Sequence, residues 1–422
     1  MSFSASVNGS RLLRSLAEFA AIGATPAGGV NRQALSPEDR AARRLLAERA
    51  QARGFSIFQD EAANLFVRRR GSHDDLPAVL IGSHLDSQPT GGRFDGALGT
   101  LSAFEVLEAI EDAGIATVRP IEVVAFTNEE GSRFAPGCMG SMVFAGVHAI
   151  REWNAARAPD GTYLEQDLAA TLDALPEAMM RHARPEVFAF IELHIEQGPV
   201  LEREGVPIGV VTAVQGTKWL EVTFTGEAAH AGTTPREFRK DAMAAAAEAI
   251  GALQATVMVA DPQARLTVGR LLLEPGSINV IPRRVTFTID IRHPERTSLA
   301  DIEKQVRTTC AMAAERWNCS LEIASRLDMA PGVFEPVLTA AIETACQTHG
   351  VACRRMTSGA FHDALFVNRI APSAMIFVPC RGGISHNEAE FVAADDIVQG
   401  AATLLDVTLD LANRKQTLPV TT

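Results

Sequence analysis

The chain has 422 residues, more than one ordinary hydrophobic core accommodates, so we expect two domains. Hydrophobic residues make up 47% of it and charged residues 21%, which is the composition of a folded globular protein and not of a disordered chain. The net charge of −12 argues against a nucleic acid or an anionic membrane surface as partner.

The cysteines and the apolar stretches bear on where the protein resides. The six cysteines lack C-x-x-C spacing, so we expect reduced thiols in a cytoplasmic protein. Residues 1–21 show a short amphipathic pattern with no long apolar core, which is not a secretory signal. The apolar stretch 242–260 is rich in alanine and holds Glu248, which favours a packing helix over a membrane span.

The first half of the chain alternates helical and strand patterns. Helical periodicity is present at 10–21, 37–53, 97–113 and 167–183. Short apolar runs rich in valine and isoleucine lie between these helices. This order predicts an α/β domain with a mostly parallel sheet flanked by helices.

The pattern changes near Thr212 and resumes after a turn at 330–332. Between them, strands and helices follow in the order β-α-β-β-α, with these expected bounds: 219–225, 241–254, 265–270, 285–291 and 299–317. This order predicts a small α+β domain with an antiparallel sheet. We therefore expect a discontinuous larger domain, 1–212 and 330–422, and an inserted domain, 213–329.

Four apolar runs are each followed by side chains that bind metals. The runs are 78–82, 121–126, 187–191 and 374–378. The side chains that follow them, in the same order, are His84 and Asp86; Glu129 and Glu130; Glu192, His194 and Glu196; Ser385, His386 and Asn387. Ligands bind at the carboxyl ends of the strands in open α/β sheets. The four runs together predict a divalent-cation site, which is typical of hydrolytic enzymes.

Within this pattern the residue types suggest roles, although each side chain alone also fits a plain structural role. Asp86 is placed to accept the second ring N–H of His84. Asp95, before the next helix, could cap that helix or bridge two ions. Of the adjacent Glu129 and Glu130, one should bind metal and the other should stand near the attacking water as a base.

Further features of the sequence bear on the metal site and on the other kinds of catalysis that it could support. Strand alternation would place Glu192, His194 and Glu196 on one face. No nucleophile elbow, Walker A loop or G-x-G-x-x-G motif is present. Cys138 fits a buried packing thiol better than a nucleophile.

Eight motifs in order along nearly the whole chain resemble the hydantoinase/carbamoylase family of the dinuclear-zinc aminoacylase and metallopeptidase superfamily. They begin at Gly82 (GSHLDS), Gly91 (GGRFDG), Glu129 (EEGSRF), Glu192 (ELHIEQG), His230 (HAGTTP), Ser277 (SINVIP), Asp290 (DIRHP) and Ser385 (SHNE). The resemblance implies two divalent ions, of Zn, Mn, Co or Ni. Their implied ligands are His84, Asp95, Glu130, His194 and His386, with Asp95 bridging. It also implies Glu129 as general base and Asp86 as an outer partner of the ligands.

The resemblance further implies substrate contacts. His230 and Asn279 resemble the family's oxyanion and substrate contacts. Arg292 resembles the clamp on a substrate carboxylate, a role that suits a planar guanidinium. Gln215, Ser358 and Phe361 would line the same cleft. Phe361 stands where the family commonly has glycine, and Ala229 stands where it often has asparagine.

We therefore expect metal-dependent hydrolysis of a linear C–N bond in an N-carbamoyl amino acid, which releases amino acid, ammonia and carbon dioxide. Allantoate hydrolysis and N-acyl amino acid or dipeptide hydrolysis are the alternatives, with a catalytically silent metal-binding homologue as a different class. The expected partners are a small carboxylate substrate and a second copy of the chain, bound through the inserted lid or dimerisation domain.

Overall fold

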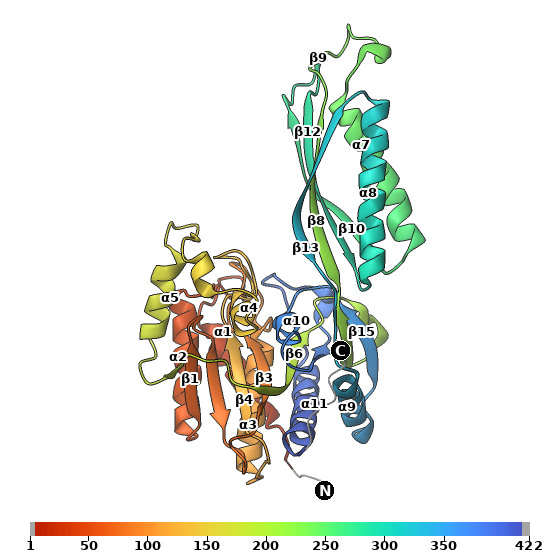
Figure 1. Cartoon of the computed structure of the whole chain (residues 1–422). Coiled ribbons are helices and arrows are strands. Elements are labelled where there is room, and N and C mark those ends of the chain that lie inside the picture. Colours follow the sequence, from red (N-terminus) through yellow and green to blue (C-terminus); the bar gives the residue numbers. More distant parts are fainter. Residues whose placement is uncertain (1–4, 416–422) are drawn as a thin grey trace. The chain divides into compact units, whose positions relative to one another are not determined.

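The computed structural model describes residues 5–415 and divides into two compact units (Figure 1). One comprises the chain up to Thr212 together with the chain from Phe334, and the other is Ala213–Val333. Each unit has its own hydrophobic core.

A ten-stranded sheet carries the first unit. Its strands are β1 (Ser56–Asp60), β2 (Leu65–Arg69), β3 (Ala78–His84), β4 (Ile121–Phe126), β5 (Met179–Arg181), β6 (Val187–Ile195), β7 (Ile208–Val214), β14 (Gly332–Val333), β15 (Cys353–Ser358) and β16 (Ser373–Val378). Their order is β14-β7-β16-β6-β3-β4-β2-β1-β5, and β15 pairs with β7. By residue number, β14 and the last two residues of β7 fall within the second unit, where the chain passes from one unit to the other.

The centre of this sheet is parallel. Strands β16, β6, β3 and β4 run in one direction, while β2 and β7 flank them in antiparallel orientation. The four central strands are buried almost throughout, which explains why each reads as a continuous apolar run. The predicted α/β fold class is confirmed.

Helices cover both faces of the sheet. One core joins the sheet to α1 (Gly9–Ala21), α2 (Pro37–Ala52), α3 (Ala97–Asp112), α9 (Pro336–Thr348) and α11 (Ala394–Ala412). On the opposite face, Phe144 of α4 (Met139–Phe144) packs against Phe66 and Phe126. The remaining elements are η1 (Ile150–Trp153), α5 (Leu164–Asp173), α6 (Val200–Glu204), α10 (Asp363–Val367) and η3 (Arg381–Gly383).

The predicted helix 167–183 is wrong in its second half. Helix α5 ends at Asp173, and the chain then forms the edge strand β5. Pro176 explains the stop, because proline disfavours helical geometry in the residue before it.

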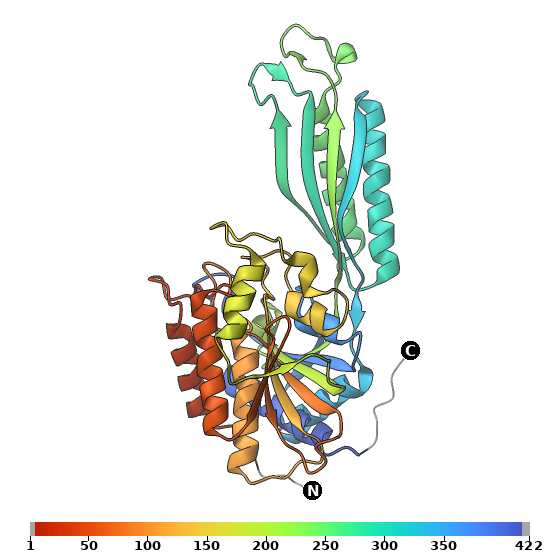
Figure 2. The same cartoon turned by 60° about the vertical axis from the view of Figure 1, so that its left-hand side comes forward.

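The second unit is an antiparallel sheet with two helices on one face (Figure 2). Its elements are β8 (Gly216–Thr225), β9 (Ala229–His230), η2 (Arg236–Phe238), α7 (Ala242–Ala260), β10 (Arg265–Glu274), β11 (Val280–Ile281), β12 (Arg284–His293), α8 (Arg296–Arg316) and β13 (Ser320–Met329). The main strand order is β10-β12-β8-β13. By length and composition α7 could cross a membrane, but it packs residues spaced three or four apart into the core of this unit.

Candidate metal centre

The four central strands deliver their polar side chains to one edge of the sheet. His84 is the last residue of β3, and His194 lies next to the end of β6. Glu129 and Glu130 follow β4, and His386 lies on the loop after β16. Parallel strands end at the same edge, so the fold itself gathers these residues.

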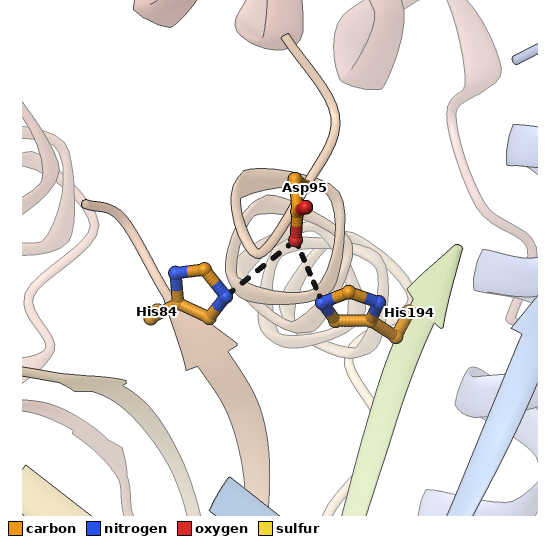
Figure 3. Close-up of side chains that lie close together, drawn as sticks. All are labelled: His84, Asp95 and His194. Atoms are coloured by element: carbon orange, nitrogen blue, oxygen red, sulfur yellow. Dashed lines mark ion pairs between the residues drawn. The ribbon is translucent and has the colours of Figure 1, made fainter. Parts of the chain in front are cut away.

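The first group of side chains is His84, Asp95 and His194 (Figure 3). The Oδ1 atom of Asp95 lies 3.8 Å from Nε2 of His84 and 3.1 Å from Nε2 of His194. All three side chains are buried. They form a compact set of two imidazoles and one carboxylate, which suits zinc and related divalent ions.

The second group uses the other oxygen of Asp95. Its Oδ2 atom lies 3.5 Å from Nε2 of His386, which is 3.2 Å from Oε2 of Glu130. Ligand atoms of these three residues also lie within 4.8 Å of one another. Because the two groups share Asp95 through different oxygens, the arrangement fits a carboxylate that bridges two cations.

The electrostatics of the groups fit a cation as well. Nε2 of His84 is buried and has no hydrogen-bond partner among the described residues. Burial lowers the pKa of His84 to about 4, so its imidazole is neutral at pH 7, the form that binds metal. Burial and the Asp95 charge raise the pKa of Glu130 well above its ordinary range, a cost that a bound cation would offset.

Asp95 and His194 titrate together. Burial alone would raise the pKa of Asp95, but the hydrogen bond and charge of His194 hold it below its usual range. Burial by itself would lower the pKa of His194. The contact with Asp95 outweighs burial and raises this pKa to about 9. Metal binding would therefore displace a proton from His194.

The Asp86 carboxylate lies beside the His84 ring, as predicted, but its Oδ1 atom is 3.7 Å from Nδ1, too far for the predicted hydrogen bond. Nδ1 of His84 instead lies 2.9 Å from the backbone oxygen of Asp86, which directs Nε2 toward Asp95. The Asp86 carboxylate accepts the backbone N–H groups of Glu129 and Glu130, at 3.2 Å each. Asp86 thus holds the turn that carries both glutamates.

Glu129 lies beside the first group. Its Oε2 atom is 3.6 Å from Nε2 of His84, and its Oε1 atom accepts a hydrogen bond from the Cys138 thiol at 3.5 Å. Burial, followed by the charges of Asp363 and Glu130, raises the pKa of Glu129 well above its ordinary range. A carboxylate with this position and basicity can accept a proton at neutral pH.

The prediction that Glu196 shares a strand face with Glu192 and His194 is wrong, and of the two alternatives for Asp95 the helix cap is excluded. Glu196 lies beyond the end of β6, and its carboxylate accepts the backbone N–H groups of Val200 and Leu201 at the start of α6. Asp95 does not cap α3, whose N-cap is Gly96. The Asp95 carboxylate instead turns toward the imidazoles.

The predicted substrate contacts Ser358 and Phe361 lie in the first unit. Ser358 is buried, and its hydroxyl lies 2.9 Å from Nε2 of His362, whose ring contacts that of His194. Phe361 is half-buried on the same loop. Ser358 is therefore engaged within the protein, whereas Phe361 remains a predicted substrate contact.

The other four predicted contacts lie in the second unit. Nδ1 of His230 accepts the backbone N–H groups of Gly232 and Thr233. The Asn279 amide oxygen accepts the hydroxyl of Ser277, and the Arg292 guanidinium pairs with Asp290 at 2.8 Å. The amide oxygen of Gln215 is buried without a hydrogen-bond partner among the described residues.

Three side chains orient the ligands, and of these sequence reasoning named only Ser385, as a candidate metal-binding residue and not as a partner of Asp95. The amide of Gln88 donates to Oε2 of Glu130 at 2.7 Å. The amide of Gln197 and the hydroxyl of Ser385 donate to Oδ2 of Asp95 at 2.9 and 2.7 Å. Each lies within three residues of a predicted site residue, but a neutral polar residue in a loop gives no periodic signal.

Comparison with known proteins identifies the family. Residues 80–410 match Peptidase family M20/M25/M40. The chain belongs to this family. Its hydantoinase/carbamoylase members are also similar over the whole length, which confirms the predicted resemblance and the predicted class of enzyme, an amidohydrolase.

Two relatives and one solved structure illustrate this similarity. The chain is 40% identical over 408 residues to an N-carbamoyl-L-amino-acid amidohydrolase of Rhizobium meliloti, a match that covers 96% of this chain and 97% of the relative. It is 35% identical over 396 residues to an allantoate amidohydrolase of Escherichia coli (strain K12), covering 93% and 95%. A crystal structure of a hydantoinase/carbamoylase family amidase from Burkholderia multivorans has a TM-score of 0.92 at 42% identity, covering 97% and 99%.

Proposed function

We propose that the protein hydrolyses the linear C–N bond of N-carbamoyl amino acids and releases the amino acid, ammonia and carbon dioxide. The observation that carries this proposal is the shared Asp95 carboxylate between two groups of metal-binding side chains, with Glu129 beside them. The similarity to an N-carbamoyl-L-amino-acid amidohydrolase over 96% of the chain supports the choice of substrate.

Two divalent cations, of Zn, Mn, Co or Ni, are the proposed cofactors. His84, His194 and Oδ1 of Asp95 would hold one, and Glu130, His386 and Oδ2 of Asp95 would hold the other. Such ions supply Lewis-acid polarisation of a carbonyl and an acidified water. Imidazole and carboxylate ligands do not by themselves select one of these metals.

The protein's own groups manage the proton. Glu129 accepts a proton from the water that attacks the carbamoyl carbon, and it then donates that proton to the leaving nitrogen. Its buried position and raised pKa suit both steps. Asp86 keeps Glu129 in place through the backbone of the turn.

Substrate recognition is assigned to residues of the second unit. Arg292 is proposed to bind the substrate carboxylate, because a guanidinium offers two parallel donors. Asp290 fixes the orientation of that guanidinium through two of its nitrogens. His230, Asn279 and Gln215 are proposed as further contacts.

A panel of substrates tests the function. N-carbamoyl, N-formyl and N-acetyl amino acids, a dipeptide and allantoate are assayed in parallel with Zn²⁺ and with Mn²⁺. We expect the carbamoyl compounds to have the highest kcat/KM. Preference for allantoate, or for acyl or peptide substrates, would replace the proposed substrate.

The variant Glu129→Gln separates an enzyme from a silent metal-binding protein. We expect it to retain the metal content of the unmodified protein and to lose turnover by about 100-fold or more, because the base is removed while the ligands stay. Metal content is measured by elemental analysis. Unchanged turnover would disprove the role of Glu129.

A cytoplasmic homodimer is the proposed state of the protein. The six cysteines are all free, which supports a reducing compartment. In the second unit β10 is an edge strand of its sheet, and Leu271, Leu272 and Leu273 on it are 39–56% exposed. An apolar edge strand is suited to pairing with a second copy of the chain.

A further inference from the structure

Glu390 has a buried carboxyl group, on the loop after β16, that faces the turn carrying Asp95. Its side chain is only 3% exposed. Its Oε1 atom accepts the backbone N–H groups of Phe94 at 2.9 Å and of Asp95 at 3.1 Å. One oxygen thus fixes two successive peptide groups, one of which belongs to Asp95 itself.

The turn is shaped around this carboxyl group. A Cβ atom at Gly92 would lie 2.0–2.3 Å from the carboxyl atoms of Glu390, a distance that no side chain tolerates. Glycine at this position therefore makes room for the carboxyl group. A side chain at position 92 would have to displace the Glu390 carboxyl group or the turn itself.

The second oxygen of Glu390 joins the hydrogen bonds around the Asp95 carboxylate. Its Oε2 atom lies 3.3 Å from the hydroxyl of Ser385, which lies 2.7 Å from Oδ2 of Asp95. A hydroxyl has one proton, and the shorter distance assigns it to Asp95. Gln197 donates to both Ser385 and Asp95, at 3.1 and 2.9 Å.

Glu390 does not behave as another metal ligand. It is absent from the three groups of converging ligand atoms found among residues 5–415, which are the two described above and a third of Glu192, His194 and His362. Its Oε1 atom already accepts two N–H groups. Its contacts go to the backbone that carries a ligand and not to the ligand cluster.

We propose that Glu390 is a positioning residue that fixes the Asp95 turn and so places the Asp95 carboxylate between the two ligand groups. This inference rests on the proposed metal-dependent function. It assigns to Glu390 a selective effect on metal affinity, because outer partners of ligands typically change that affinity 10- to 100-fold.

Three variants test the inference. Glu390→Ala removes the acceptor for both N–H groups, and we expect Zn²⁺ affinity to fall about 10- to 100-fold. Glu390→Gln keeps a carbonyl oxygen for these donors and should restore affinity close to that of the unmodified protein. Glu388→Gln is the control, because Glu388 lies on the same loop and its carboxylate accepts the Thr25 hydroxyl instead of the N–H groups of Phe94 and Asp95.

Affinity is measured by competition with a chromophoric chelator, and kcat and KM are measured with an N-carbamoyl amino acid at saturating Zn²⁺. Circular dichroism and Tm report folding. If Glu390→Ala does not fold, Glu390→Asp replaces it, because it withdraws the carboxylate by one methylene group. We expect weaker Zn²⁺ binding and a lower kcat with little change in KM.

The results distinguish this inference from the proposed function. If the unmodified protein binds no metal, the proposed function fails. If it binds metal and Glu390→Ala or Glu390→Asp binds Zn²⁺ equally well, the inference is overturned. A fall in Tm with unchanged metal affinity overturns it too, because the role of Glu390 would then be structural only.

Discussion

Gly96 shows how closely the backbone approaches the ligands at the scale of one residue. It has φ of +62°, and a Cβ atom there would lie 2.3–2.4 Å from three atoms of the His84 ring. The position therefore demands glycine both for its backbone conformation and for space. The first reason is common at helix ends, while the second ties the start of α3 to the metal centre.

We predict that Gly96→Ala displaces the His84 imidazole and weakens metal binding more than it weakens the fold. Gly114→Ala is the matched control, because Gly114 also has φ of +62° but has no atom within 4 Å of the added Cβ. Both variants pay a similar backbone strain of about 1–3 kcal/mol. Zinc content and Tm are measured for both, and equal zinc content in the two variants would contradict the prediction.

Arg292 provides a prediction about substrate selection. Arg292→Gln should lower kcat/KM for an N-carbamoyl amino acid by about 10- to 100-fold, because a hydrogen-bonded charge is lost. Arg292→Lys should recover little, because lysine lacks the planar pair of donors. For the corresponding N-carbamoyl amino acid amide, which has no carboxylate, all three proteins should have similar kcat/KM.

At the residue scale, sequence reasoning found the candidate metal ligands more completely than the residues that orient them. His84, His194, His386 and the pair Glu129 and Glu130 became candidates because apolar strands precede them. The family resemblance then selected Glu130 as the ligand, and the structure places it and the three histidines around Asp95. The hydrogen bond of Asp86 could not be found, since it depends on the path of the backbone between two strands. Adjacency in the sequence suggested His84 as its partner, but the fold brings the Glu129 turn closer.

At the element scale, burial decides what can be predicted. The central strands are mostly apolar because helices cover both faces, so their bounds were found within a few residues. Strand β13 was missed because none of its ten residues is fully buried and an irregularity between Ser325 and Leu327 divides its alternation into two short pieces. Its place in the sheet is set by backbone pairing with β8, which no side-chain pattern reports.

Helix α2 is held to the sheet by a buried ion pair, which leads to a prediction about stability. Arg43 and Asp39 are at most 1% exposed and lie 2.9 Å apart. Arg43 also donates to the backbone oxygen of Ala63 and to the hydroxyl of Thr127, just after β4. The pair thus connects α2 to the strand that leads to the catalytic turn.

We predict that Arg43→Met destabilises the protein by about 3–5 kcal/mol, because it leaves Asp39 buried without its counter-charge. Arg44→Met, one residue further on the exposed side of α2, should change stability by less than about 1 kcal/mol. Urea unfolding at pH 7 measures both. A similar midpoint for the two variants would show that Asp39 finds another partner or a proton.

At the scale of the whole molecule, the candidate metal ligands and the proposed substrate contacts lie in separate units. The candidate ligands and Glu129 lie in the first unit, whereas Arg292, His230 and Asn279 lie in the second. The change from a parallel to an antiparallel pattern near residue 213 made this division visible in the sequence. The proposed association of two chains is not visible in it, because the leucines at 271–273 would suit a buried strand as well as the exposed edge strand β10.

Leu272 tests the proposed dimer. It is 56% exposed on the edge strand β10, and Leu272→Lys places a charge where a second chain would pair. We expect the unmodified protein to be a dimer by light scattering at micromolar concentration and the variant to be a monomer with an unchanged circular dichroism spectrum. Met179→Lys is the control, because Met179 is 52% exposed on an edge strand of the first unit and should leave the dimer intact. A dimer that survives Leu272→Lys but dissociates with Met179→Lys would move the interface to the first unit, because each substitution adds the same charge to an edge of similar exposure.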